Sequence, residues 1–207
     1  MPVATFPIGP LETNSYVLSN GSKALAIDVG GEPNPILRYL NEHGLTLVDI
    51  VLTHLHFDHL YGVAELAKVS RAPVHTPRRD SVIAKSEAAT GGIWSFPKVP
   101  PFTGEDIDEG ECVLAGLPCR ILHTPGHTPG SLSYYFPSEH LVFTGDALFY
   151  RSVGRTDFPG GSAETLLASI REKLFTLPEE TRVLPGHGPE TSIGDERRNN
   201  PFCGDFS

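Results

Sequence analysis

Short apolar runs at the start of the chain predict an antiparallel sheet. Residues 3–8 and 14–19 are rich in Val, Ile, Tyr and Leu, and a third run follows at residues 23–29. Asn20-Gly21, which separates the second run from the third, tolerates the positive φ angles of a tight hairpin turn. A further run at residues 47–52 has the Val, Ile and Leu content of a buried strand.

Helices are expected between these strands. Asn34 followed by Pro35 predicts the cap and first position of a helix of about ten residues, which Gly44 closes. Residues 63–69 and 77–89 predict a second and a third helix. The glycines and prolines that follow predict a long irregular connection.

Strand patterns dominate the second half of the chain. Short strands are predicted at residues 112–115, 119–122, 131–136, 141–143 and 182–184. Ser162 is expected to cap a helix whose apolar side chains, up to Leu174, recur at helical spacing. Because strands occur in both halves with helices at intervals, we predict a helix-covered sandwich of sheets, formed by one domain over residues 1–207.

Charge and composition exclude several classes of function. The chain has 16 Lys and Arg against 25 Asp and Glu, a formal net charge of −9, whereas phosphate backbones are bound by the opposite balance. Nucleic acid is therefore not expected as a partner. The first positive side chain is Lys23, and no apolar run reaches the ~18 residues of a membrane span. We expect a cytoplasmic protein with no membrane attachment, whose three cysteines are inert.

The nine histidines are the compositional anomaly, and four metal-binding side chains fall within six residues. These are His54, His56, Asp58 and His59. His54 and His56 lie on one side of an extended chain but would diverge on a helix, so the ligands must project from a loop or strand end. Imidazole and carboxylate together suit zinc, iron or manganese.

Three further side chains of ligand type each follow a short apolar run and stand beside a glycine. They are His127, Asp146 and His187. Loops that leave strands at the same edge of a sheet converge, so we expect these residues to meet the first cluster. Seven ligands are too many for one zinc ion and are the right number for two divalent ions that share Asp146.

These residues belong to five short motifs, which occur in order over residues 53–188: His-X-His-X-Asp-His, Pro-Gly-His-Thr, Thr-Gly-Asp, Gly-Arg-Thr-Asp and Pro-Gly-His-Gly. Because it contains this set of motifs, the chain resembles the metallo-β-lactamase superfamily, and within it the glyoxalase II (hydroxyacylglutathione hydrolase) group. The resemblance implies an α+β fold, a four-layer αββα sandwich with the metals at one edge of the two sheets. It implies that the first metal is held by His54, His56 and His127, the second by Asp58, His59 and His187, and that Asp146 bridges them.

The chemistry expected of such a site is hydrolysis of an activated acyl group. Two divalent ions about 3.5–4 Å apart make a bridging hydroxide available at neutral pH, and one ion can polarise the carbonyl under attack. A thioester suits this site because its thiolate leaves without a strong general acid. Asp58 is the candidate to orient the hydroxide. The resemblance implies S-2-hydroxyacylglutathione, typified by S-D-lactoylglutathione, as the small-molecule substrate.

Several departures from the longer glyoxalase II enzymes bear on the substrate. Those enzymes carry a C-terminal helical domain, and this chain resembles the short bacterial form without it. Arg155 matches the basic residue that grips the glutathione carboxylate, but Asp157 stands where the family has an aromatic residue. Tyr150 is a candidate to line the substrate pocket, whereas Phe149 is expected in the core. The arginines of the Glu196-Arg197-Arg198 run are expected on a solvated face or over the site.

Two other functions stay open at this point. The Gly-Arg-Thr-Asp-Phe run also resembles persulfide dioxygenases of the same superfamily, which use one iron held at positions that match His54, His127 and Asp146. A metal-binding protein without catalytic activity is the second alternative. The ligands do not distinguish a monomer from a small homo-oligomer. His43, His75, His123 and His140 lie outside the motifs, and His123 is the one expected near the site.

Overall fold

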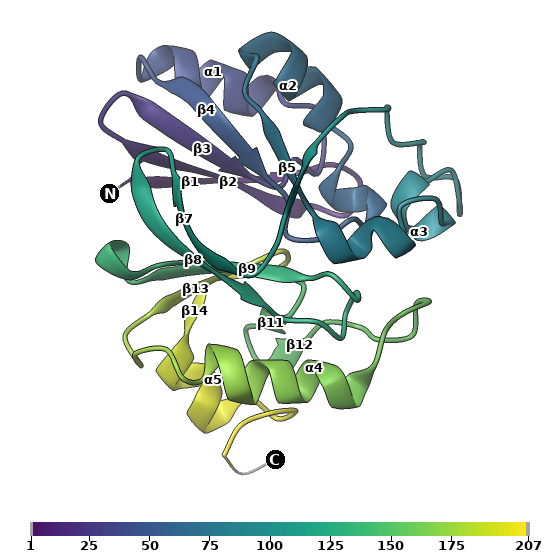
Figure 1. Cartoon of the computed structure of the whole chain (residues 1–207), viewed down its shortest axis with the longest axis vertical. Coiled ribbons are helices and arrows are strands. Elements are labelled where there is room, and N and C mark those ends of the chain that lie inside the picture. The colour runs from purple at the N-terminus through teal and green to yellow at the C-terminus, as the bar shows by residue number, and fades with distance from the viewer. Residues whose placement is uncertain (1, 206–207) are drawn as a thin grey trace.

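Side chains along a strand alternate between the two faces of its sheet, and here both faces are apolar. In strand β2 (Thr13–Asn20), Tyr16 and Leu18 belong to one buried cluster and Val17 to another. Strands of this kind need cover on both sides. The computed structural model, which describes residues 2–205, provides it with two sheets packed face to face and helices on both outer faces (Figure 1).

The first sheet contains six strands in chain order: β1 (Val3–Ile8), β2, β3 (Lys23–Ile27), β4 (Thr46–Val51), β5 (Val74–Pro77) and β6 (Glu105–Ile107). The first three strands pair antiparallel, and β3 to β6 pair parallel. Helices α1 (Asn34–Glu42) and α2 (Val63–Ser70) follow β3 and β4 in the chain, and they cover the outer face with Ile36, Leu40, Val63 and Leu66.

The second sheet has the strand order β14 (Thr191–Ser192), β13 (Arg182–Pro185), β10 (Leu141–Gly145), β9 (Leu132–Phe136), β8 (Leu117–His123) and β7 (Gly110–Leu114). β13 and β10 are parallel, and β9 is antiparallel to both β10 and β8. β8, β10 and β13 therefore run in the same direction and end at the same edge. The outer face is covered by α4 (Ala163–Ser169), which continues as a π turn over Ile170–Leu174, and by α5 (Ile193–Asn199). A small hairpin of β11 (Leu148–Phe149) and β12 (Ser152–Val153) follows β10.

The four-layer α+β sandwich predicted from the sequence is confirmed. The predicted cap at Ser162 is also confirmed, because its hydroxyl accepts a hydrogen bond from the Thr165 N–H at 3.2 Å. α1 begins at Asn34 itself, with Pro33 at the cap position, so the predicted start is displaced by one residue.

The predicted helix over residues 77–89 is wrong. This segment contains a 3₁₀ turn at Arg78–Val82 and the short helix α3 (Glu87–Thr90). The reason is Asp80, which is fully buried and accepts hydrogen bonds from groups outside the segment. A continuous helix would not place that carboxylate against all three donors. None of the helices described between residues 2 and 205 combines the length and apolar character that crossing a membrane requires.

The layer between the sheets depends on Phe143, so its replacement by alanine should destabilise the protein. The ring is fully buried and packs edge-on against Tyr16 and Phe136, at centroid distances of 5.2 and 5.9 Å. We expect Phe143→Ala to lower the free energy of unfolding by about 3–5 kcal/mol, measured by denaturant titration followed by circular dichroism. Val113→Ala, at a side chain that is 67% exposed, should stay within about 0.5 kcal/mol of the parent protein. Equal effects of the two substitutions would contradict this account of the core.

Candidate metal centre

Four strand ends meet at one edge of the sandwich. β4 of the first sheet ends at Val51, just before the loop of residues 53–59. In the second sheet, β8, β10 and β13 end just before His127, Asp146 and His187. The structure brings all seven ligand-type residues predicted from the sequence to this edge.

Three histidine side chains, from two loops, form the first group. Nε2 of His127 lies 3.2 Å from Nε2 of His54 and 2.8 Å from Nδ1 of His56, and all three residues are buried. Burial lowers the pKa of His54 well below its usual range and that of His56 to about 3. The rings of His54 and His56 are therefore neutral and offer lone pairs, as metal ligands must.

The second group consists of Asp58, His59 and His187. Oδ2 of Asp58 lies 3.2 Å from Nε2 of His187 and 3.6 Å from Nε2 of His59. Burial opposes a charge on His59, but the carboxylates of Asp28, Asp58 and Asp146 raise the pKa of this histidine well above its usual value. The position is thus built to hold positive charge.

Asp146 lies between the two groups. Its Oδ1 is 3.4 Å from Nε2 of His59, and its Oδ2 is 3.5 Å from Nε2 of His127 and 3.6 Å from Nε2 of His187. Burial would raise the pKa of this carboxyl, but His59 and His127 hold it well below the usual range, so the group is ionised. One carboxylate can therefore serve both groups.

Two buried atoms of the centre lack a hydrogen-bond partner among the described residues. They are Nε2 of His59 and Oδ1 of Asp146. Leaving a buried polar atom unpaired costs about 1–3 kcal/mol, so such atoms call for an explanation. A cation held between them would satisfy both, and the imidazole and carboxylate donors suit zinc, iron or manganese. The residues present therefore fit a metal ion.

Asp28, at the end of β3, orients two histidines of the centre. Its Oδ2 accepts hydrogen bonds from Nδ1 of His59 at 2.8 Å and from the Thr53 hydroxyl at 2.7 Å, and its Oδ1 accepts from the Thr53 N–H at 2.8 Å. The Thr53 oxygen in turn lies 3.0 Å from Nδ1 of His54 and can accept its proton. Both rings thus carry the proton on Nδ1 and turn Nε2 toward the centre.

Asp80 ties the two loops of the first group together. Its carboxylate accepts hydrogen bonds from the Leu55 N–H at 2.9 Å, from the Thr128 hydroxyl at 2.9 Å and from the Gly130 N–H at 2.6 Å. Leu55 stands between His54 and His56, and Thr128 follows His127. The buried carboxylate therefore sets the distance between histidines that are far apart in the chain.

The first sheet also holds the loop that carries His187. The Asn14 side chain donates to the carbonyls of Pro185 and Gly188, and the Tyr16 hydroxyl donates to Pro185 at 2.7 Å. At Gly186 the backbone passes so close to the centre that a Cβ would lie 2.2 Å from Oδ1 of Asp146. Only glycine fits there.

A cavity of about 460 Å³ opens at the centre, and five of the seven ligand-type residues line it together with seven other side chains. Phe149, expected in the core, is instead only half-buried and lines this cavity, 6.1 Å from the His187 ring. Arg155 lines it as well. Tyr150 is 47% exposed beside Arg151 and stands outside the lining found among residues 2–205.

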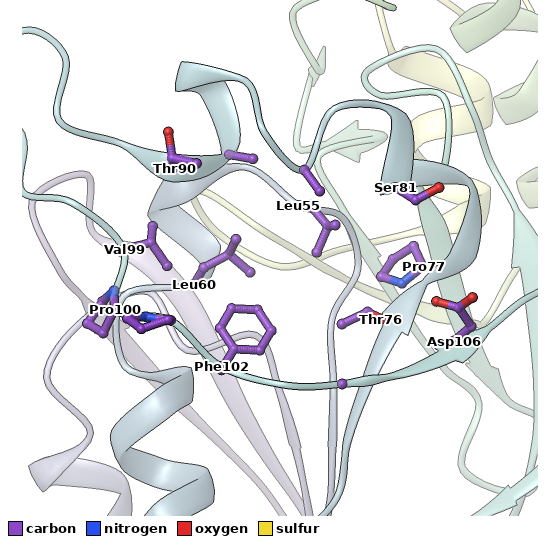
Figure 2. A pocket seen from close by; sticks show the side chains of 14 residues that line it. Leu55, Leu60, Thr76, Pro77, Ser81, Thr90, Val99, Pro100, Phe102 and Asp106 are labelled. Atoms are coloured by element: carbon purple, nitrogen blue, oxygen red, sulfur yellow. The ribbon is translucent and has the colours of Figure 1, made fainter.

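A second cavity, of about 410 Å³, lies against the same ligand loop. Leu55 and Leu60, which flank ligand positions in the chain, line it with Val99 and Phe102 (Figure 2). The alternation of side chains along residues 54–56 explains the arrangement, because the histidines turn to the centre and Leu55 turns away from it.

The basic side chains of His123, Arg197 and Arg198 pair with groups other than the seven ligand-type residues. His123 contacts Arg79 and the Pro129 carbonyl, and Arg197 and Arg198 form ion pairs with Asp205 and Glu179. Sequence reasoning missed Asp28 and Asp80 as supports of the centre. Asp28 carries a usable signal, since it follows a buried strand and stands close to glycines, as His127, Asp146 and His187 do. Asp80 carries none, because it follows two arginines in a segment that resembles a solvated helix.

Comparison with known proteins places these observations in a family. The sequence pattern of the metallo-beta-lactamase superfamily matches residues 8–187. The chain is 42% identical over 204 residues to a probable metallo-hydrolase, YqgX, of Bacillus subtilis, with 97% of each chain covered. It is 34% identical over 207 residues to the hydroxyacylglutathione hydrolase GloC of Haemophilus influenzae, with 98% of each covered. The crystal structure of TTHA1623 in a di-iron-bound form is 39% identical, with a TM-score of 0.87 over 98% of this chain and all of the other.

Asp28→Asn should weaken metal binding. The amide nitrogen would meet the Nδ1–H of His59 or the Thr53 hydroxyl, and a His59 ring that moves its proton to Nε2 can no longer bind a metal there. We expect the affinity for zinc to fall about 10–100-fold, measured by competition with a chromophoric chelator. Asp49→Asn is the matched control, because Asp49 also pairs with a histidine, His75, at 3.1 Å but away from the centre. An unchanged affinity in Asp28→Asn would show that Asp28 does not orient a ligand.

Proposed function

The chain belongs to the metallo-beta-lactamase superfamily, and from that premise we propose that it hydrolyses the thioester bond of S-2-hydroxyacylglutathione. It is a metal-dependent hydrolase of this superfamily. S-D-lactoylglutathione is the type substrate, and a 2-hydroxy acid and glutathione are the products. The observation that carries the proposal is the pair of ligand groups that share Asp146 beside an open cavity. The hydroxyacylglutathione hydrolase of Haemophilus influenzae, which covers nearly the same length, supports the substrate class.

We assign two divalent metal ions to the centre. His54, His56 and His127 would hold the first ion, Asp58, His59 and His187 would hold the second, and Asp146 could serve both. Zinc, iron and manganese all accept this donor set. When bound, the ions supply Lewis acidity, which activates water at neutral pH and polarises the carbonyl of the thioester.

Asp58 orients the attacking water. Burial would raise the pKa of its carboxyl, but His59 and His187 lower it, so the group is ionised and can accept a hydrogen bond from water. The Thr13 hydroxyl, 3.2 Å from Oδ2, fixes the orientation of the carboxylate. The oxygen of water bonds to the acyl carbon, the C–S bond breaks, and the thiolate takes a proton. A thiol has an ordinary pKa of about 8.5, so the chain needs no strong acid for this leaving group.

Arg155 and Tyr150 are proposed to bind the glutathione half of the substrate at the rim. Nε and Nη2 of Arg155 donate to Asp157, both at 2.7 Å, and Nη1 is then available for one carboxylate of glutathione. Tyr150 presents an exposed ring in the turn just after β11. Both contacts lie outside the buried ligand groups.

The protein of known metal content should release glutathione from S-D-lactoylglutathione with a kcat/KM of about 10⁴ M⁻¹s⁻¹ or more. A thiol reagent follows the release. His187→Ala removes a proposed ligand of the second ion. This substitution should lower kcat/KM at least about 100-fold, which is the loss that removal of a residue supporting a ligand can cause. His140→Ala, a histidine that is 54% exposed beside Glu180, should keep the parent activity. Absence of turnover in the fully metallated protein would overturn the proposal.

One observation favours a second function, a persulfide dioxygenase. His54, His127 and Asp146 bring two imidazoles and one carboxylate together, the donor set of many non-haem iron oxygenases. Such an enzyme would convert glutathione persulfide, O₂ and water to glutathione and sulfite. Oxygen uptake by the iron-loaded protein with glutathione persulfide, without thioester hydrolysis, would establish this function. A metal-binding protein without catalytic activity would show neither reaction.

A further inference from the structure

Apart from the proposed ligands, the cavity at the metal centre is almost entirely apolar. The other lining residues are Leu11, Phe57, Trp94, Phe96, Phe149, Phe158 and Arg155. Five of these seven carry aromatic rings, and Arg155 is the one cation among the residues described in the lining. Its guanidinium already faces the Asp157 carboxylate and the Phe158 ring, which lies 4.2 Å away.

Two pairs of aromatic rings line the cavity beside the first ligand group, and we call these four residues the aromatic wall: Phe57, Trp94, Phe96 and Phe158. Phe158 packs edge-on against the ring of His56 at 5.3 Å. Trp94 stacks on Phe158 with centroids 6.2 Å apart and planes inclined by 24°. The rings of Phe57 and Phe96 lie 5.3 Å apart. The pair of Phe158 and Trp94 therefore runs from His56 outward to the exposed indole.

Trp94 occupies an unfavourable place for a large apolar side chain. It is 67% exposed, and both Trp94 and Ser95 have positive φ angles, of 48° and 69°. Such angles are uncommon outside glycine, and strain of this kind is concentrated where a ligand is held. The turn is closed by a hydrogen bond from the Gly92 N–H to the Pro97 carbonyl at 3.0 Å. An apolar group bound against the indole would recover the cost of its exposure.

We infer that the substrate's acyl group carries a large, flat apolar substituent, such as an aryl ring, which packs against the aromatic wall. This inference rests on the proposed thioester hydrolysis and specifies its substrate. Glutathione brings two carboxylates and an ammonium group, and the single cation of the lining, shared with Asp157, does not neutralise both carboxylates. The thiol half therefore stays at the rim, and the acyl half enters between the rings.

Two substrates that share the thiol and the 2-hydroxyl test this inference. S-D-lactoylglutathione has a methyl group where S-D-mandeloylglutathione has a phenyl ring. We expect kcat/KM for the mandeloyl thioester to be at least about tenfold higher, since even a methylene in a fitted apolar pocket is worth about tenfold. Lactoyl turnover equal to or faster than mandeloyl turnover would overturn the inference and leave the proposed function intact. Hydrolysis of neither thioester by the metal-loaded protein would overturn the proposed function itself.

Substitution of Trp94 tests whether the aromatic wall causes the preference for the mandeloyl thioester. Trp94→Ala should lower kcat/KM for the mandeloyl thioester about tenfold and that for the lactoyl thioester less than about threefold, while Trp94→Phe should restore most of the preference. Val113→Ala, at a side chain as exposed as Trp94 but on β7, should change neither rate. Circular dichroism and zinc content confirm that each variant is folded and loaded. A preference for the mandeloyl thioester that survives in Trp94→Ala would overturn the role of this wall.

Discussion

The buried carboxylate of Asp28 is the constraint on which the metal centre depends. Asp28 directly follows β3 and is buried. Its carboxylate accepts hydrogen bonds from the backbone N–H and hydroxyl of Thr53 and from the ring of His59. A buried charge is tolerated only when such partners surround it. The hydrogen bond from His59 places the proton of that ring on Nδ1. The Asp28 carboxylate thus both stabilises the end of the strand and orients the His59 ring.

The sandwich explains why the polar residues collect at one edge. Its strands bury apolar side chains on both faces, and the carboxylates and imidazoles of the centre stand in the loops where the strands end. Three strands of the second sheet end together there, and the first sheet reaches across through Asn14 and Tyr16 to hold the loop that carries His187. Asp80 adds a further connection between loops. The site is consequently built from hydrogen bonds between segments distant in the chain, each shielded from water.

The cavity combines two environments that favour different parts of a substrate. Its floor is the cluster of imidazoles and carboxylates, whereas its wall is aromatic and its one cation lies toward the rim beside Asp157. A thioester that places its carbonyl at the floor must therefore leave its charged half outside. This division follows from desolvation, since a carboxylate placed against the rings would lose its hydration and gain no ion pair in return.

The sequence by itself predicted the layers and the residues of ligand type, because both depend on short-range pattern. Short apolar runs marked the strands, and the spacing of His54 and His56 required an extended chain. The meeting of the seven ligand-type residues at one edge was predicted from strand ends, and the structure brings these residues together. Only the tertiary structure decided the roles of Asp28, Asp80, Phe149 and Trp94. Asp80 turned a predicted helix into a 3₁₀ turn because its partners lie 25 to 50 residues away. Phe149 and Trp94 line the cavity because the fold brings their segments, which are distant in the chain, to the same site. Local pattern reports which face of an element is buried, but not which distant group a side chain will meet.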